Sequence, residues 1–319
     1  MMKNAVAYLI FSIFFLFIES EAYSQCCSAG NPVSGDGQQK SINKNQLRIY
    51  WSFKHNYSDQ YFFKNKKEDI PFIDNSRFNY SSLQATYGVS KKWNIQTELG
   101  YFFDKSQTVE IPEKYVFKGF GIGDLGITTK YQILSLIKPQ SELVGSFGVK
   151  IPVGKFDQDM DGAMLPISLQ PSTGAMKYNI GLYYSRVNLN NKWSFYSFLF
   201  AEYSSLIQSD FFYYKYGNYY SLALFGKYKL TNRIYTVLQL RQEFWDKDKR
   251  ENDEKIESTG SKVTYMAPQI LYNFYESWYL LAQADVPLYK YVNGHQLTNK
   301  YSFSFGVHKT LNLHKKSSE

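Results

Sequence analysis

Hydrophobic and polar residues alternate along most of the chain. In residues 124–133, the odd-numbered positions are Leu, Ile, Thr, Tyr and Ile, whereas the even-numbered positions are Asp, Gly, Thr, Lys and Gln. Residues 94–103 and 142–151 follow the same pattern, with Phe102 and Val144 as exceptions. Because side chains point alternately to the two faces of a strand, each segment predicts a strand with a mainly apolar and a mainly polar face. A soluble β-sandwich would show the same alternation.

The connections between these segments distinguish the two fold classes, because short turns and long polar loops alternate strictly. The short turns lie at residues 90–92, 135–140, 189–192, 230–232 and 276–277, and the long connections at 57–75, 104–119, 154–170, 207–216, 246–260 and 289–299. Short turns at one rim and long loops at the other are typical of an outer-membrane barrel. The sequence therefore predicts an all-β, transmembrane, antiparallel up-and-down β-barrel of about twelve strands, with both ends in the periplasm.

A tryptophan follows three of the short turns, at Trp93, Trp193 and Trp278. Tryptophan and tyrosine are enriched where membrane proteins meet the lipid headgroups, so these residues predict an aromatic girdle at the short-turn rim. The composition agrees with this interpretation. Aromatic residues make up 18% of the 319 residues while the mean hydropathy is −0.40, as expected for strands with one polar face.

The first residues have the pattern of an export signal. Lys3 precedes the apolar stretch Ala5 to Ile18, and Ala22-Tyr-Ser24 supplies small residues for cleavage before Gln25. Residues 1–24 are therefore predicted to be a signal peptide. Apart from this stretch, no apolar run approaches the ~20 residues that a membrane helix needs. Any membrane span must then be made of strands.

Residues 25–44 are rich in Gly, Ser, Asn and Gln and have no periodicity. They predict a flexible N-terminal tail or a plug that lies inside the barrel. The barrel itself is predicted for residues 45–310 and a basic C-terminal tail for residues 311–319. The adjacent Cys26 and Cys27 could capture a metal, act in redox chemistry or link to a partner; alternatively they form a strained vicinal disulfide or two free thiols. Lipidation of Cys26 is disfavoured because Gln25, the residue before it, is not small.

The net charge of +8 has two interpretations. It could attract nucleic acid or anionic substrates, or it could belong to a solvated surface. The charges occur in blocks of mixed sign, such as residues 246–255, which favours the solvated surface. No phosphate-binding loop, paired metal motif or nucleic-acid module is visible, so the sequence predicts no nucleic-acid partner.

Four segments carry a resemblance to a known family. They are Gly119–Tyr131 (GFGIGDLGITTKY), Gly148–Gly154 (GVKIPVG), Leu165–Gly174 running on to Tyr184, and Val286–Tyr289 running on to Gln296. Together they resemble the outer-membrane proteins named after the meta-cleavage pathway of phenol degradation, which are related in general character to channels for long-chain fatty acids and aromatic hydrocarbons. The resemblance implies a barrel, suggests transport and brings no catalytic residues. One departure is the basic tail that continues past Phe305, where many barrels end at an aromatic residue.

If the apolar faces meet lipid, the polar faces point into the lumen. The residues predicted to line it are Glu98, Asp124, Lys130, Lys150, Lys177, Asn179, Lys227, Gln239, Arg241, Glu243, Gln283 and Asp285. They could form a neutralised network that braces the wall, a polar path for solutes, or both, because charges in a narrow space must pair or stay hydrated. A barrel of about twelve strands has a narrow lumen, and inward-facing Tyr80, Tyr183 and Tyr235 would narrow it further.

Two segments contain residues that could serve other chemistry. Asp157, Asp159 and Asp161 precede Gly162 and resemble the start of a calcium loop, but Ser168 stands where a bidentate acid is expected, so a solvated acidic loop is the alternative. His308 shares a predicted face with Ser304, yet residues four apart on a strand are too distant for a nucleophile–base pair. The sequence therefore predicts no enzyme activity and no cofactor apart from calcium.

These features favour an outer-membrane channel or transporter in a Gram-negative bacterium, for passive uptake of small organic solutes, hydrophobic or aromatic ones among them. The expected partners are outer-membrane lipid, the solute and the barrel-assembly machinery. No segment resembling an energy-coupling plug domain precedes the barrel. The alternative is a non-conducting barrel with a structural or partner-binding role, in which the long loops or the tail with its two cysteines contact a partner.

Overall fold

The computed structural model describes residues 39–69, 73–110, 113–137, 140–188, 192–208 and 213–313. The predicted signal peptide, both cysteines, most of the predicted N-terminal tail and the end of the C-terminal tail lie outside these residues. Eleven strands form the wall of the sheet: β1 (Gln46–Lys64), β3 (Ile73–Gly88), β4 (Trp93–Val109), β6 (Leu125–Ile137), β7 (Gln140–Ile151), β10 (Lys177–Val187), β11 (Trp193–Ser204), β14 (Tyr219–Lys229), β15 (Ile234–Trp245), β16 (Ser261–Tyr275) and β17 (Trp278–Asn312).

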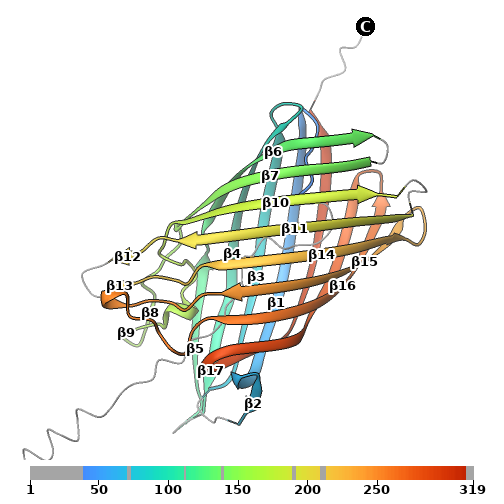
Figure 1. Ribbon diagram of the computed structural model, residues 1–319. Helices are drawn as coiled ribbons and strands as arrows, with labels where there is room; N and C mark the ends of the chain where they lie inside the picture. Colours follow the sequence, from blue (N-terminus) through green and yellow to red (C-terminus); the bar gives the residue numbers. More distant parts are fainter. Residues whose placement is uncertain are drawn as a thin grey trace, which may run out of the picture.

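The sheet closes on itself. Each wall strand pairs antiparallel with the next one along the chain, and β17 pairs with β1 from Gln46 opposite Asn312 onward. Strand β17 crosses the wall twice: residues up to Val292 pair with β16, whereas Val292 and the residues from His295 onward pair with β1. The reversal lies at Asn293–Gly294, where Gly294 adopts a φ of +59° that favours glycine. The eleven strands therefore make twelve passes, and the predicted barrel of about twelve antiparallel strands is confirmed (Figure 1).

Each strand separates two kinds of side chain. In β14, Ser221, Ala223 and Phe225 are buried inside the barrel, whereas Leu222 and Leu224 between them are exposed on the outside. The same alternation runs through β10, β11 and β15. The outer surface is therefore an apolar belt, and the strands place their polar side chains inside, as the sequence pattern predicts. Within the described part of the chain, no helix is long and apolar enough to cross a membrane.

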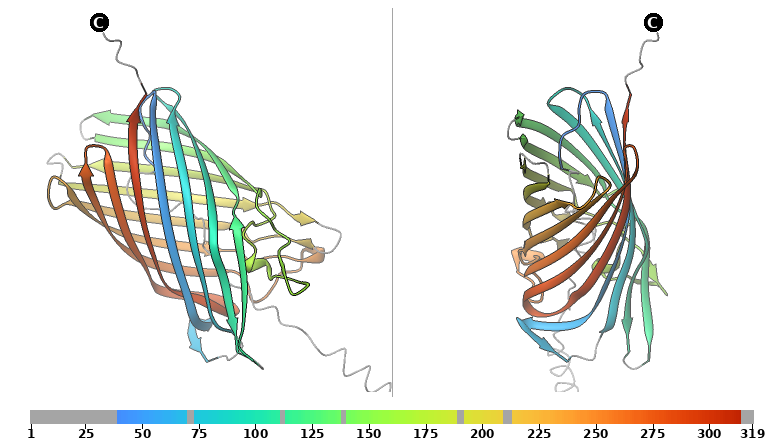
Figure 2. Two further views of the ribbon diagram at one scale, coloured as in Figure 1. Left: turned by 180° about the vertical axis from the view of Figure 1, so that it is seen from behind. Right: turned by 90° about the vertical axis from the view of Figure 1, so that its right-hand side faces the viewer.

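The two ends of the barrel differ. Short turns join β3 to β4 and β14 to β15 at the end where β17 finishes, and Leu313 donates a backbone hydrogen bond to Asn45 there (2.8 Å). The longer loops, which carry the small hairpins β8 (Asp159–Met160) with β9 (Ala163–Met164) and β12 (Ile207–Gln208) with β13 (Tyr213–Tyr214), lie at the opposite end (Figure 2). Two short 3₁₀ turns, η1 (Ile167–Leu169) and η2 (Glu251–Asp253), also lie in these loops.

Three of the predicted long loops are shorter than expected. Strand β1 continues to Lys64 and is followed by β2 (Lys66–Glu68), β4 continues to Val109 before β5 (Tyr115–Ile122), and the predicted loop at 289–299 lies almost wholly within β17. The sequence interpretation was wrong here because polar residues end the apolar alternation. The strands nevertheless continue, since their backbone groups find partners in the neighbouring strand.

Candidate functional site

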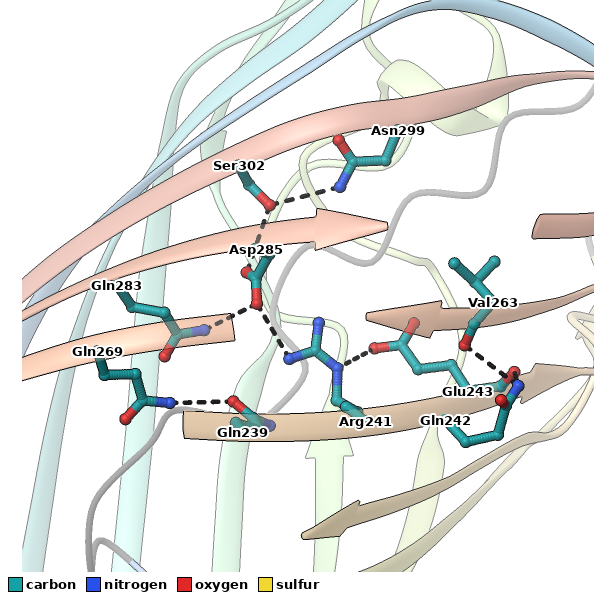
Figure 3. A network of polar contacts seen from close by, with 10 residues as sticks. All are labelled: Gln239, Arg241, Gln242, Glu243, Val263, Gln269, Gln283, Asp285, Asn299 and Ser302. Atoms are coloured by element: carbon teal, nitrogen blue, oxygen red, sulfur yellow. Dashed lines mark hydrogen bonds and ion pairs between the residues drawn. The ribbon is translucent and has the colours of Figure 1, made fainter. Parts of the chain in front are cut away.

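Most residues predicted to line the lumen are buried, and they gather in separate groups. The largest group surrounds Arg241 on β15 (Figure 3). Its Nε lies 2.7 Å from Oε1 of Glu243, two residues along the same strand, and its Nη1 lies 3.2 Å from Oδ1 of Asp285 on β17. The three side chains are at most 5% exposed. The Tyr265 ring on the intervening strand β16 lies 4.7 Å from the guanidinium carbon.

Amide and hydroxyl groups extend this network along the wall. Gln283 donates to Oδ1 of Asp285 (2.9 Å) and Ser302 donates to its Oδ2 (3.4 Å). Beside them, Nε2 of Gln269 donates to Oε1 of Gln239 (3.0 Å). A polar network thus connects β15, β16 and β17, and Arg241 is paired with two carboxylates.

A second charged group lies on β7, β10 and β11. Glu202 on β11 faces two ammonium groups, with Nζ of Lys150 on β7 at 2.7 Å and Nζ of Lys177 on β10 at 3.5 Å. Asn179 lies next to Lys177 on the inward face of β10 and opposite Gly148 of β7. If position 148 carried a side chain, its Cβ would lie only 2.6 Å from Oδ1 of Asn179. Glycine at that position therefore makes room for the amide.

The remaining predicted residues each have their own surroundings. On β4, Glu98 accepts a hydrogen bond from Nε2 of Gln84 (3.2 Å). Lys130 is 1% exposed on β6. Nζ of Lys227 lies 4.4 Å above the ring of Tyr235, one of the inward-facing tyrosines of the prediction. The predicted residues therefore do not converge on one binding point.

An apolar strip inside the barrel was not predicted. It is made of buried side chains from five neighbouring strands: Val144, Tyr183, Phe198, Phe200, Tyr219, Ala223, Phe225 and Val237, with Tyr196 and Trp245 packed against them. The strip lies beside the Arg241 network, because Phe198 is opposite Ala223 and Ala223 is opposite Arg241 in the sheet. The inner face of the barrel thus carries an aromatic strip next to the polar network around Arg241.

The sequence held a signal for this strip. Residues 195–200 read Phe-Tyr-Ser-Phe-Leu-Phe, so aromatic residues occupy both faces of β11 instead of one. Val144, which breaks the alternation of β7, is also part of the strip. Along β11 the inward side chains run from Glu202 near the long loops through Phe200 and Phe198 toward the short turns. A solute entering from the long-loop end would therefore meet charge first and aromatic rings afterwards.

The described start of the chain lies inside the short-turn end of the barrel. The backbone amide of Ile42 donates to Oδ1 of Asn94 (3.0 Å), and Nδ2 of Asn94 donates back to the carbonyl of Ile42 (2.9 Å). The backbone amide of Ser41 donates to Oε1 of Glu142 (3.3 Å), which also accepts from Nε2 of Gln132 (2.9 Å). We call residues 39–45 the N-terminal strap.

Asp124 holds a loop rather than facing an open lumen. It accepts hydrogen bonds from the hydroxyls of Ser172 and Thr173 (both 2.6 Å) and from the backbone amide of Thr173 (3.1 Å). The same loop packs tightly on β5 at Gly119. If this position carried a side chain, its Cβ would lie only 2.0 Å from the carbonyl oxygen of Leu169. The glycine-rich segment 119–124 therefore lets the loop between β7 and β10 approach the wall.

The long loops that follow β11 and β15, which we call the outer loops, are joined to one another. The carboxylate of Asp248 accepts hydrogen bonds from the Tyr214 hydroxyl and from the backbone amide of Gly217 (2.6 Å). Burial raises the pKa of Asp248, because an apolar environment penalises the charged form. The Tyr216 hydroxyl donates to the carbonyl of Thr173 (3.2 Å), which links these loops to the one that Asp124 holds.

The acidic loop does not form a metal cage. Asp159 belongs to the β8–β9 hairpin, the carboxylate of Asp161 accepts a hydrogen bond from Tyr115, and Asp157 lies 3.9 Å from Nζ of Lys155. In the described parts of the chain, no three His, Cys, Asp or Glu side chains are grouped so that they could hold a metal ion. The structure therefore does not bring the three carboxylates to one point.

The comparisons with known proteins support the fold. No protein-family model matches the chain, and no curated protein matches its sequence. The structure is similar to the COG4313 outer membrane channel from Pseudomonas putida F1, with a TM-score of 0.70 and 14% identity over 87% of this chain and 100% of that chain. The NanC porin has a TM-score of 0.46 (12% identity, 83% of this chain and 100% of that chain) and the CymD monoaromatic hydrocarbon channel one of 0.45 (8% identity, 85% and 90%). The first likeness establishes the barrel fold.

Replacing Arg241 by Met should destabilise the barrel. The substitution leaves Glu243 and Asp285 buried without the guanidinium that both contact, and breaking a buried ion pair on one side costs roughly 3–5 kcal/mol. The measurement is urea-induced unfolding in lipid vesicles. The matched control adds Glu243→Gln and Asp285→Asn to Arg241→Met and should recover much of the loss. Equal stability of the wild type and the single variant would contradict the role given to this network.

The joined outer loops should lose stability as the pH rises above the ordinary Asp value near 3.8. Because its pKa is raised, Asp248 keeps a proton in the folded loops that it releases when the loops unfold. The stability of the folded loops therefore falls as the pH rises from 3.8 to the raised pKa of Asp248. Hydrogen exchange of the Gly217 amide, corrected for its intrinsic pH dependence, should become faster across this window. In Asp248→Asn the corrected rate should stay level; a parallel rise in both proteins would argue against Asp248 as the cause.

Proposed function

We propose that this protein is an outer-membrane channel of a Gram-negative bacterium that lets small organic solutes, including hydrophobic and aromatic ones, enter passively. The closed barrel with an apolar outer belt supports the membrane location, since only a closed sheet satisfies its backbone groups in lipid. The fold shared with an outer membrane channel is consistent with it. Export behind a cleaved signal peptide and insertion by the barrel-assembly machinery belong to the same proposal.

The observation that carries the proposal is the aromatic strip inside the barrel. Phe198, Phe200 and Phe225 would supply apolar contact to a solute that reaches the strip, within a lumen that also carries charged and amide side chains. Each ring can stabilise an aromatic solute through contact area and through offset or edge-to-face ring geometry. The charged group around Glu202 lies at the long-loop end of the strip, where it would orient polar substituents of the solute.

The second candidate function is a non-conducting barrel that has a structural or partner-binding role. It is favoured by the burial of the same strip, since Phe198 and Phe200 are each 3% exposed. In this interpretation the rings are simply a core that fills the lumen, and the joined outer loops are the surface that a partner contacts. Permeation separates the two candidates, because a filled lumen conducts no solute.

We further propose that the N-terminal strap narrows the short-turn end of the channel. Replacing Asn94 by Leu removes both hydrogen bonds to Ile42 and should release the strap. Single-channel recording of the refolded mature protein should then show larger current steps than the wild type. Gln96→Leu is the matched control, because Gln96 is also buried on β4 but bonds to Thr86 of the wall (3.3 Å). Unchanged steps in Asn94→Leu would count against a narrowing role.

Replacing Phe198 by Gln should weaken the preference for aromatic solutes. The loss of about 1 kcal/mol of apolar contact corresponds to a roughly fivefold fall in the flux of an aromatic carboxylate relative to an aliphatic hydroxy-carboxylate of similar size. The flux ratio is measured in vesicles that contain the refolded protein. Leu199→Gln, next to it but on the outer surface, should leave the ratio unchanged. A ratio insensitive to Phe198 would refute solute contact with the strip.

A further inference from the structure

Two of the short turns have the same arrangement of side chains, and we call each turn with the strand ends beside it a corner. In the first, Trp93 begins β4 and lies opposite Tyr131 of β6, with ring centroids 4.7 Å apart. The preceding Lys92 accepts a backbone hydrogen bond from Gln132 (2.9 Å), and its ammonium lies 5.9 Å from the centre of the Tyr131 ring. The turn is fixed by Ser90, whose hydroxyl accepts from the backbone amides of Lys92 and Trp93 (3.2 and 3.1 Å).

The second corner repeats this arrangement. Trp193 begins β11 and lies opposite Tyr228 of β14, with ring centroids 4.5 Å apart. The preceding Lys192 accepts a backbone hydrogen bond from Lys229 (2.9 Å), the residue after the tyrosine, as in the first corner. The outward-facing Arg186 of β10 is opposite Phe195 and thus diagonal to Trp193. Each corner therefore contains the sequence Lys-Trp at the start of a strand and a tyrosine on the next strand that contacts the tryptophan.

The charge at this rim has one dominant sign. Among the described residues of the short turns and the adjoining outward positions, the cations are Lys91, Lys92, Arg186, Lys192, Arg233 and Lys309, and the acid is Glu276. A third Lys–Trp contact joins Lys309 to Trp278, with the ammonium 4.7 Å above the ring. The rim therefore presents an excess of positive charge beside Trp93, Trp193 and Trp278.

These cations lie at the boundary between two surfaces. Trp93 and Trp193 are 50% and 44% exposed, and Phe195, two residues into the barrel wall from Trp193, is 57% exposed on the apolar belt. On the other side of the tryptophans lie the polar turns. If the belt lies in the membrane as proposed above, Lys92, Lys192 and Arg186 lie at the depth of the lipid phosphates, where tryptophan and tyrosine also prefer to be.

We propose that the two corners bind the headgroups of anionic glycerophospholipids in the periplasmic leaflet. The ammonium and guanidinium groups would donate charge-assisted hydrogen bonds to the phosphate and its anionic neighbour, while the Trp–Tyr pair packs against the glycerol and the first acyl carbons. Because few acidic side chains lie at this rim, a bound anion is not repelled. The proposal rests on the membrane location in the proposed function and is independent of whether the lumen conducts.

The test measures lipid selection around the refolded mature protein in vesicles of phosphatidylcholine that contain a minor fraction of spin-labelled lipid. Wild-type protein should retain labelled phosphatidylglycerol in its motionally restricted shell about fivefold more strongly than labelled phosphatidylcholine at low salt. The variant with Lys92→Gln, Lys192→Gln and Arg186→Gln should lose most of this preference. Raised salt should weaken the preference in the wild type, because exposed charges are screened.

A matched control removes the same kind of charge at the other end. Lys118→Gln with Lys262→Gln changes outward-facing lysines near the long loops and should keep the wild-type preference. An equal preference in the triple variant and the wild type would overturn the proposal, as would no preference in the wild type. Heat-modifiable gel mobility shows whether each protein is folded in the bilayer. A wild-type barrel that does not insert would overturn the membrane location as well, whereas a silent but lipid-selective barrel would overturn only the channel.

Discussion

The pairing of β1 with β17 is the constraint on which the rest of the structure depends. It joins the two ends of the sheet from Gln46 opposite Asn312 to the long-loop end, so no long edge strand is left open along this seam. A closed sheet has one inner face, and each strand must place its alternate side chains there. The apolar belt outside and the crowded polar lumen inside are both consequences of this closure.

Closure also explains how the lumen is organised. Charges that face each other in a small space must be paired, and Arg241 and Glu202 each have two opposite charges within 3.5 Å. Where a bulky side chain needs room, the wall supplies a glycine. A Cβ on Gly100 would lie 1.9 Å from the hydroxyl of Tyr80, so this tyrosine can lie flat against β4 only because position 100 has no side chain. The aromatic strip lies beside the charged groups, so the inner face carries both apolar and charged side chains.

The sequence predicted the barrel and its approximate strand number, because a two-residue period and alternating loop lengths are local patterns. It did not predict the aromatic strip, since inward Phe198 and outward Leu199 are both apolar and their faces are known only from the register with β10 and β14. The role of Asp124 was also hidden, because its partners lie 48 and 49 residues away in the chain. The extent of β4 beyond Phe103 depends on pairing with β3 and β5, which is likewise not local.

The central claim is that the lumen of this barrel passes small organic solutes along its aromatic strip. Its most direct test is single-channel recording of the wild-type mature protein with an aromatic carboxylate as the main anion, folding being confirmed by heat-modifiable mobility. We predict discrete current steps and a reversal potential that shows the aromatic anion crossing. A folded barrel that gives no steps, or steps carried by the small inorganic ions alone, would contradict it.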